Sequence, residues 1–486
     1  MSEQEPVGVV FPEVDGRRST SATGRAIVAD ALRGVDPVGA AAVERETNWR
    51  SGYLVPFRRL VEAGLASPES ARHIAEDGLT SLTARMRYRD ADGSQLSLAE
   101  VAGTPAANPL ETETLHGGGQ REEHLSLPYQ GRRLVGGDIL DVLETWVGDG
   151  VVEPSFAAAI GDVVDHPEWL DLRGRTIGVI GAGSEMGPYR SLLRWGATVA
   201  AVDLPRRGLW DRVLTDAASS AGTLLVPTRS GTGPLTTHAG ADVTSEVSAV
   251  AAWLTDLPGD LVLGNYVYAD GAANVRVATA VDTITEAVRT NRDGEVTLAF
   301  LATPTDIFAV PGEAVRASAA AYAHRRTSKV LRGPLRTMSG GRLLKRNYGV
   351  GEDPGLNDSV VLQQGPNYLL AKRLQRWRAT TARAQGAQVS FHVAPPTRTR
   401  SVVKNRALAA AYGGAHRFGV TVFEPGTANT LMAALLVRDL AAGVPAHEHP
   451  WQDEAYAAAH GGLWRCAYDP RSALGLAAIL GLGSAR

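Results

Sequence analysis

The sequence contains a single cysteine, Cys466, among 486 residues. One thiol cannot form an intramolecular disulfide, and it cannot by itself build a zinc site made of cysteines. Such sparse use of cysteine is typical of proteins in a reducing compartment. Residues 1–18 are acidic and hold no apolar core of signal-peptide length. We therefore expect a cytoplasmic protein.

Charge and hydrophobicity are not concentrated anywhere along the chain. The 49 Lys and Arg residues nearly balance the 52 Asp and Glu residues, for a net charge of -3. This balance gives no reason to expect nucleic acid or an acidic membrane surface as a partner. No run approaches the roughly 18 apolar residues of a membrane span. His447 and His449 have no matching set of acid or cysteine ligands nearby, so we expect no metal site. The partner we expect is a small-molecule substrate.

A glycine turn between two apolar runs is the most informative feature of the chain. The segments around it read in order as a buried strand, a glycine turn, a helix, a second strand and an acid. They are residues 176–180, the glycines Gly181, Gly183 and Gly187, residues 189–195, residues 198–202 and Asp203. This order is the layout of a dinucleotide-binding βαβ unit, in which glycines let the backbone approach a pyrophosphate.

The chain is too long for one ordinary core, so we expect more than one domain. Residues 26–84 have helical periodicity, and residues 88–131 are rich in Gly, Pro and Thr and are expected to form loops. Beyond Asp203, apolar runs alternate with helical segments, which favours a parallel sheet covered by helices. The expected later strands are residues 222–227, 260–268, 295–303, 359–364, 388–396 and 420–425.

These patterns together predict an α/β fold. A Rossmann-like doubly wound parallel sheet is expected over residues 171–430, with an additional, mainly helical N-terminal domain or cap at residues 1–170. Residues 431–486 are expected to form a helical C-terminal extension.

Tyr368 and Lys372 are four residues apart in the helix expected at residues 367–386. At this spacing the two side chains point the same way, one turn apart. An ammonium beside a phenol lowers the pKa of the phenol, so Tyr368 is expected to exchange protons near neutral pH. Tyr-x-x-x-Lys also arises by chance, and a tyrosine near a helix start commonly serves packing. Whether this pair is catalytic therefore depends on the order of the segments around it.

That order resembles the short-chain dehydrogenase/reductase superfamily over residues 172–430. In this superfamily a Tyr-x-x-x-Lys helix precedes a strand that ends near Pro-Gly and Thr, as VSFHVAPPTRT does here. IGAGSEMG also aligns without gaps on the superfamily turn Thr-Gly-x-x-x-Gly-x-Gly. Gly181 and Gly187 take the first and last glycine positions of that turn, and Gly183 is incidental to it.

The resemblance implies an NAD- or NADP-dependent oxidoreductase that interconverts a carbonyl and an alcohol. Tyr368 would be the acid/base, and Lys372 would assist it by binding the nicotinamide ribose. A serine or threonine polarises the substrate oxygen in the superfamily; we favour Thr303 over Ser359, with residues 304–366 as an insertion. The implied cofactor-binding residues are Gly181, Gly183, Ser184, Glu185, Met186, Gly187, Asp203, Arg206, Asp242, Val243 and Asn265. Subunit pairing in the superfamily also suggests a homodimer.

Two departures leave alternatives open. Glu185 replaces the middle glycine of the superfamily turn, and its carboxylate would oppose a pyrophosphate unless it is paired or turned away. Asp203 favours NAD, whereas Arg206 and Arg207 suit the 2′-phosphate of NADP. The same glycine turn and acid also resemble the first motifs of S-adenosylmethionine-dependent methyltransferases. A third possibility is a catalytically degenerate, reductase-like binding module.

Overall fold

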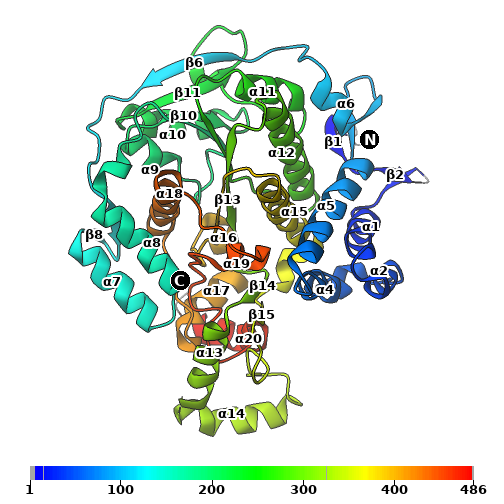
Figure 1. The fold of residues 1–486 in the computed structure, drawn as a ribbon, viewed down its shortest axis with the longest axis vertical. Helices are drawn as coiled ribbons and strands as arrows, with labels where there is room; N and C mark the ends of the chain where they lie inside the picture. Colours follow the sequence, from blue (N-terminus) through cyan, green and yellow to red (C-terminus); the bar gives the residue numbers. More distant parts are fainter. Residues whose placement is uncertain (1–5, 15, 325, 484–486) are drawn as a thin grey trace.

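A seven-stranded sheet runs through the centre of the protein in the computed structural model, which describes residues 6–14, 16–324 and 326–483 (Figure 1). The strand order is β16-β13-β12-β9-β10-β11-β6, and only the pairing of β11 with β6 is antiparallel. The strands are β6 (Glu111–His116), β9 (Thr176–Ile180), β10 (Thr198–Val202), β11 (Thr223–Thr228), β12 (Leu261–Asn265), β13 (Val296–Ala302) and β16 (Val389–Val393). The chain runs outward from β9 to β11 and then returns to β12, so the direction of winding reverses between β9 and β12.

Helices cover both faces of this sheet because its strands are apolar on both sides. Successive side chains of a strand point to opposite faces. In β10, Ala200 and Val202 enter a first core and Val199 and Ala201 a second. The first core is covered by α11 (Val247–Thr255), α12 (Ala272–Asn291) and α15 (Gly365–Ala384). The second is covered by α7 (Gly137–Gly148), α8 (Pro154–Asp165), α9 (Tyr189–Arg194), α10 (Arg207–Ala218) and α18 (Pro425–Ala442). The predicted α/β class and mainly parallel sheet are confirmed.

The N-terminal region contributes to the same two cores. Trp49, Phe57 and Leu82 lie in the first core together with residues of the sheet. The helices here are α1 (Thr20–Arg33), α2 (Pro37–Glu44), α3 (Trp49–Gly52), α4 (Leu54–Gly64), α5 (Pro68–Arg85) and α6 (Leu98–Gly103). A small sheet of β1 (Gly8–Val10), β4 (Arg87–Arg89) and β5 (Gln95–Ser97) lies beside them, and β2 (Glu13–Val14) pairs with β3 (Arg17–Arg18). The three-part division of the chain stays a prediction, and residues 1–5, 15, 325 and 484–486 lie outside the described ranges.

The segment between β13 and α15 carries structure of its own, in the place of the expected insertion. β14 (Ile307–Val310) pairs with β15 (Gly355–Asp358), and α13 (Gly312–His324) and α14 (Arg326–Met338) lie between them. After β16 the chain forms α16 (Arg400–Lys404), α17 (Arg406–Gly414), α19 (Pro450–Ala455) and α20 (Pro470–Gly481). α17, α20 and the β14–β15 pair lie together below the sheet in the view of Figure 1.

Three expectations about strands were wrong. Residues 359–364 form no strand in the described structure, because β15 ends at Asp358 and a 3-10 turn occupies Leu362–Gln364. In the described chain, residues 420–425 make only an isolated bridge, between Phe423 and Thr397, and Pro425 starts α18. Conversely, β6 forms within the region expected to be loops. Its Glu and Thr side chains are mostly exposed, as suits a strand at the edge of a sheet. Its sequence therefore lacks the alternation of apolar and polar residues that marks a half-buried strand.

β7 (Ser126–Tyr129) and β8 (Arg132–Val135) form a further hairpin that packs against α18. None of the helices in the described ranges is both long enough and apolar enough to span a lipid bilayer.

Candidate functional site

The predicted site residues gather at the carboxyl edge of the sheet. Gly181 follows β9, Asp203 follows β10, Asn265 ends β12 and Thr303 follows β13. These strands are neighbours and parallel, so their carboxyl ends share one edge. The winding reverses between β9 and β12, and open α/β sheets bind ligands in the crevice at such a point.

The glycine turn after β9 is shaped by close backbone approaches. Gly181 has a φ of 90°, and a Cβ on it would lie 2.9 Å from the carbonyl carbon of Tyr266. The Gly183 N–H donates to Oδ2 of Asp203 at 2.7 Å. A Cβ on Gly183 would lie 2.9 Å from Cδ1 of Leu209 and 3.1 Å from that carboxylate oxygen. Gly183, which is incidental to the superfamily turn, is thus required here by packing, because Asp203 lies directly against it.

The remainder of the turn is closed by its own backbone. Ser184 N–H donates to the carbonyl of Gly181 at 3.0 Å, and Gly187 N–H donates to the carbonyl of Ser184 at 3.2 Å. Met186 N–H donates to Oγ of Ser184 at 3.4 Å. α9 begins only after Pro188 and is six residues long.

Glu185 points out of the turn and is paired. Its Oε2 accepts from the backbone N–H of Arg400 at 2.8 Å, and its Oε1 accepts from Nε of Arg400 at 3.0 Å. The side-chain Nδ2 of Asn429 donates a hydrogen bond to the backbone carbonyl of Glu185 at 3.1 Å. The carboxylate is thus turned toward the start of α16 and partly neutralised there. Sequence reasoning missed Arg400, which lies 215 residues away along the chain.

Asp203 is held in place by the backbone around it. Besides the bond from Gly183, its Oδ1 accepts from the N–H of Leu204 at 2.7 Å. Burial raises the pKa of Asp203 above its ordinary value, and these N–H groups offset part of that shift. Arg206 is exposed at the start of α10 and lowers the pKa of Asp203 slightly through its charge.

The loop that holds Asp242 and Val243 lies beside Asp203. Ala241 N–H donates to the carbonyl of Asp203 at 2.9 Å. Val243 is buried. The carboxylate of Asp242 accepts from the N–H and the hydroxyl of Thr244, at 2.9 Å and 2.7 Å. The carboxylate of Asp242 therefore caps the turn at residues 242–244, which lies beside Asp203.

Tyr368, near the start of α15, belongs to a cluster of hydroxyl groups. The side chains of Thr303, Thr305 and Gln364 surround its phenol and lower the pKa of that phenol. The two threonine hydroxyls are 2.9 Å apart, and Nε2 of Gln364 donates to Oγ1 of Thr305 at 2.9 Å. Thr303 thus makes the contact expected of the second hydroxyl. Ser359 does not, because its hydroxyl donates to Asn357 at 2.5 Å.

The acidity of Tyr368 differs from the expectation. Burial raises the pKa of Tyr368 to about 12, although its hydrogen bonds offset part of the shift. The predicted lowering by Lys372 was wrong, because removing the phenol from water opposes its ionisation more strongly than its surroundings favour it. Tyr368 therefore carries its proton at neutral pH and is a proton donor.

Lys372 is linked to the end of β12 through one side chain. Its Nζ donates to Oε1 of Gln375 at 3.2 Å, and Nε2 of Gln375 donates to Oδ1 of Asn265 at 3.2 Å. Burial lowers the pKa of Lys372 to about 8, against the opposing charge of Asp306. Gln375, which the sequence did not single out, thus connects Lys372 to Asn265.

The segment after β12 connects the glycine turn to Tyr368. Tyr266 N–H donates to the carbonyl of Ile180 at 2.9 Å, next to Gly181. Two residues further on, the ring of Tyr268 meets the ring of Tyr368 edge-on, with centroids 6.1 Å apart. The turn and the hydroxyl cluster therefore flank one short segment of chain.

α15 is fixed by buried ion pairs on its other faces. Asp306 accepts from Arg376 at 3.0 Å and from Arg373 at 3.4 Å, and Arg378 pairs with Asp282 of α12 at 2.7 Å. All five side chains are buried. These pairs hold Tyr368 and Lys372 in place against β13 and β12.

Among the residues the structure describes, no group of three or more His, Cys, Asp or Glu side chains is placed to hold a metal ion. No family model matches the chain, and a search of curated proteins finds no significant match. The geometry of the site itself therefore has to support any functional proposal.

Proposed function

We propose that the protein is an NAD(P)-dependent oxidoreductase of the short-chain dehydrogenase/reductase type that reduces a carbonyl to an alcohol. The observation that carries this proposal is the hydroxyl cluster of Thr303 and Tyr368 at the carboxyl edge of the sheet. Lys372 lies one helical turn beyond Tyr368, and the glycine turn follows β9 at the same edge of the sheet. A Rossmann-like reading of the fold is supported by the strand order, which in the six parallel strands corresponds to 3-2-1-4-5-6.

The residues around the glycine turn fit a dinucleotide. The carboxylate of Glu185 is paired with Arg400, which offsets the charge that would oppose a pyrophosphate at this turn. In the proposal the turn at residues 181–187 holds the pyrophosphate, and Asp203 or Arg206 the adenine-side ribose. Asp242 and Val243 adjoin the adenine, and Lys372 and Asn265 hold the nicotinamide ribose. When bound, the nicotinamide supplies the hydride for the carbonyl carbon.

The protein's own residues then manage the proton. Thr303 orients the carbonyl by hydrogen bonding to its oxygen, and Tyr368 donates its proton to that oxygen as negative charge develops there. The high pKa of Tyr368 keeps it protonated before the reaction, which favours the reductive direction. The hydroxyls of Thr303 and Thr305 stabilise the phenolate that remains, since both lower the pKa of the phenol.

The pKa of Lys372 predicts how cofactor affinity changes with pH. Lys372 is charged below about pH 8 and neutral above it. A hydrogen bond from a charged donor is worth about 1.5 kcal/mol or more, so we expect the affinity for NADH to fall about tenfold as the pH rises from 7 to 10. Calorimetric titration with NADH across this range measures it. Lys372→Arg keeps its charge and should show a flat profile; equal slopes in both proteins would contradict the role of Lys372.

The pairing of Glu185 with Arg400 predicts a compensating pair of substitutions. Arg400→Ala frees the carboxylate beside the turn, and we expect NADH to bind about fivefold more weakly, a change of about 1 kcal/mol. Glu185→Gln removes the charge and should strengthen binding slightly. The double variant should bind within about twofold of wild type, since neither charge remains. If the double variant binds as weakly as Arg400→Ala alone, Arg400 contacts the cofactor itself and Glu185 is irrelevant.

Two alternatives are separated from this proposal by ligand binding. The glycine turn and Asp203 also suit S-adenosylmethionine, but a methyltransferase leaves the cluster of Tyr368 and Thr303 without a role. A degenerate binding module would bind neither cofactor. Titrating the protein with NADH and NADPH while following nicotinamide fluorescence tests the proposal, and calorimetry with S-adenosylhomocysteine is the matched comparison. Saturable binding of a nicotinamide dinucleotide alone is expected; heat from S-adenosylhomocysteine alone would favour the methyltransferase.

A further inference from the structure

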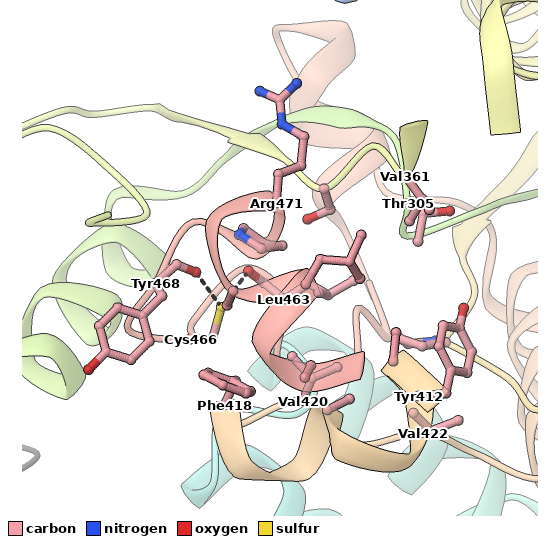
Figure 2. Close-up of a pocket in the computed structure, with 18 of the residues that line it drawn as sticks. Thr305, Val361, Tyr412, Phe418, Val420, Val422, Leu463, Cys466, Tyr468 and Arg471 are labelled. Carbon is pink, nitrogen blue, oxygen red and sulfur yellow. Dashed lines mark hydrogen bonds between the residues drawn. The ribbon is translucent and has the colours of Figure 1, made fainter. Parts of the chain in front are cut away.

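An apolar pocket opens beside the hydroxyl cluster of Tyr368 (Figure 2). It is built from four parts of the chain: the segment between β13 and α15, Pro396 after β16, the stretch from α17 to residue 422, and the C-terminal residues 463–477. The empty space between its lining residues, part of it open to solvent, is about 660 Å³. The apolar wall includes Val361, Phe418, Val420, Val422, Leu463 and Leu474.

One end of this pocket reaches the proposed proton donor. Thr305 lines the pocket, and its hydroxyl also lies beside the phenol of Tyr368, whose pKa it lowers. Tyr412 lines the same end, where burial and the neighbouring Tyr368 raise the pKa of its phenol. Figure 2 shows Thr305, Val361 and Tyr412 on one side of the pocket, opposite Cys466 and Tyr468. A ligand that fills the pocket can therefore place one polar group against Thr305 and Tyr368.

The rest of the lining offers little to a charged or strongly polar ligand. Of the described residues that line the pocket, only Arg471 is charged, and its guanidinium points away from the other labelled side chains (Figure 2). It donates to Oδ2 of Asp358 at 2.5 Å. The thiol of Cys466 donates to the carbonyl of Tyr468 at 3.1 Å. The hydroxyl of Ser359 is bonded to Asn357. Burying a charge in such a lining without a partner is costly.

We propose that this pocket binds the apolar body of an uncharged ketone or secondary alcohol, with the oxygen of the ligand at Thr305 and Tyr368. The ligand class is a molecule with one polar oxygen and an aliphatic or ring-containing hydrocarbon body. The reaction of such a ligand rests on the oxidoreductase function proposed above. Its binding does not, and it can be measured without cofactor.

The experiment is a direct binding titration with 6-propionyl-2-(dimethylamino)naphthalene, an uncharged aromatic ketone whose emission shifts to the blue in apolar surroundings. We expect saturable binding with a blue shift. 2-Decanone should displace the dye at a concentration at least tenfold lower than 9-oxodecanoate, which has a similar chain with a terminal carboxylate. This comparison uses the unmodified protein.

Substitutions then locate the site. Val422→Trp fills the pocket and should weaken dye binding at least tenfold, whereas Val38→Trp, at a position 70% exposed on α2, should leave it unchanged. Tyr368→Phe removes one of the two hydroxyls proposed to face the ligand oxygen and should weaken dye binding about fivefold, less than Val422→Trp does. Far-ultraviolet circular dichroism confirms that each variant is folded.

Three results would overturn the inference: no saturable dye binding, equal displacement by the keto acid, or full binding by folded Val422→Trp. Failure of the oxidoreductase proposal is recognised separately. If the dye binds as expected while neither NADH nor NADPH binds, the apolar ligand site stands and the proposed reaction is wrong.

Discussion

Tyr368→Phe is expected to lower kcat for carbonyl reduction by about 10²–10⁴-fold, the usual contribution of a positioned general acid. The substitution removes only the hydroxyl that donates the proton. Neighbouring Thr303 and Thr305 remain, but an aliphatic hydroxyl is a far weaker acid than a phenol. The measurement is the rate of NADH or NADPH oxidation at saturating concentrations of an uncharged ketone. The dissociation constant for the dinucleotide should stay within about twofold of wild type.

A matched substitution separates chemistry from packing. Tyr456→Phe also removes one phenol hydroxyl, from a half-buried tyrosine that contacts Arg438 away from the cluster. We expect kcat for this variant to equal that of wild type, and both variants to unfold at the wild-type temperature. Turnover by Tyr368→Phe at the wild-type rate would remove Tyr368 from the mechanism while leaving the fold untouched.

Glu153→Gln is expected to lower the free energy of unfolding by about 3–5 kcal/mol, the usual result of breaking a buried ion pair. Glu153 precedes α8 and is buried. Its Oε1 accepts from Nε of Arg465 at 2.8 Å and from Nε2 of His460 at 2.9 Å, and its Oε2 accepts from Nη2 of Arg465 at 2.7 Å. The pair fixes the segment that carries Leu463 into the apolar pocket. Denaturation by urea measures the change.

The same ion pair gives a pH dependence with a definite sign. Burial alone would raise the pKa of Glu153, but Arg465 and His460 outweigh it and lower the pKa to about 2. A carboxyl with a lowered pKa stabilises the fold above its unfolded pKa of about 4.3. That stability is lost as the pH falls from about 4.5 toward 2. The difference in the free energy of unfolding between wild type and Glu153→Gln should therefore have its largest value at pH 7 and decrease as the pH falls from about 4.5 toward 2.

Glu62→Gln is the matched control for this prediction. Glu62 pairs with Arg58 on α4 at 2.7 Å, but both side chains are exposed. An exposed pair of this spacing contributes about 0.3–0.5 kcal/mol, so the control should unfold at nearly the wild-type urea concentration. If Glu153→Gln and Glu62→Gln unfold at the same urea concentration, the buried contacts of Glu153 with His460 and Arg465 do not anchor the segment that carries Leu463.

The sequence predicted the centre of the sheet well because its strands are buried on both faces. The apolar run at residues 176–180 coincides with β9, and the run at 198–202 with β10. At the edge the same reasoning failed. β6 is polar and exposed, so no alternation marks it. In the segment 420–425, Val420 and Val422 line the pocket and Phe423 bridges to Thr397, without joining the sheet.

In the candidate site, too, some features were predictable from the sequence and others were not. Thr303, Tyr368 and Lys372 were predictable because residues at the carboxyl ends of parallel strands, and on the helix that follows, meet at one edge. The acidity of Tyr368 was not, since burial depends on tertiary packing. Nor was the pairing of Glu185 with Arg400, because no local pattern connects two residues so far apart in the chain.

The most direct measurement is a crystal structure of the protein grown with the reduced dinucleotide that binds more tightly. We predict a pyrophosphate against the turn at residues 181–187, the carboxylate of Glu185 still on Arg400, and a nicotinamide ring facing the phenol of Tyr368. Density for a dinucleotide elsewhere on the protein, or a nicotinamide ring remote from Tyr368, would contradict the proposed function.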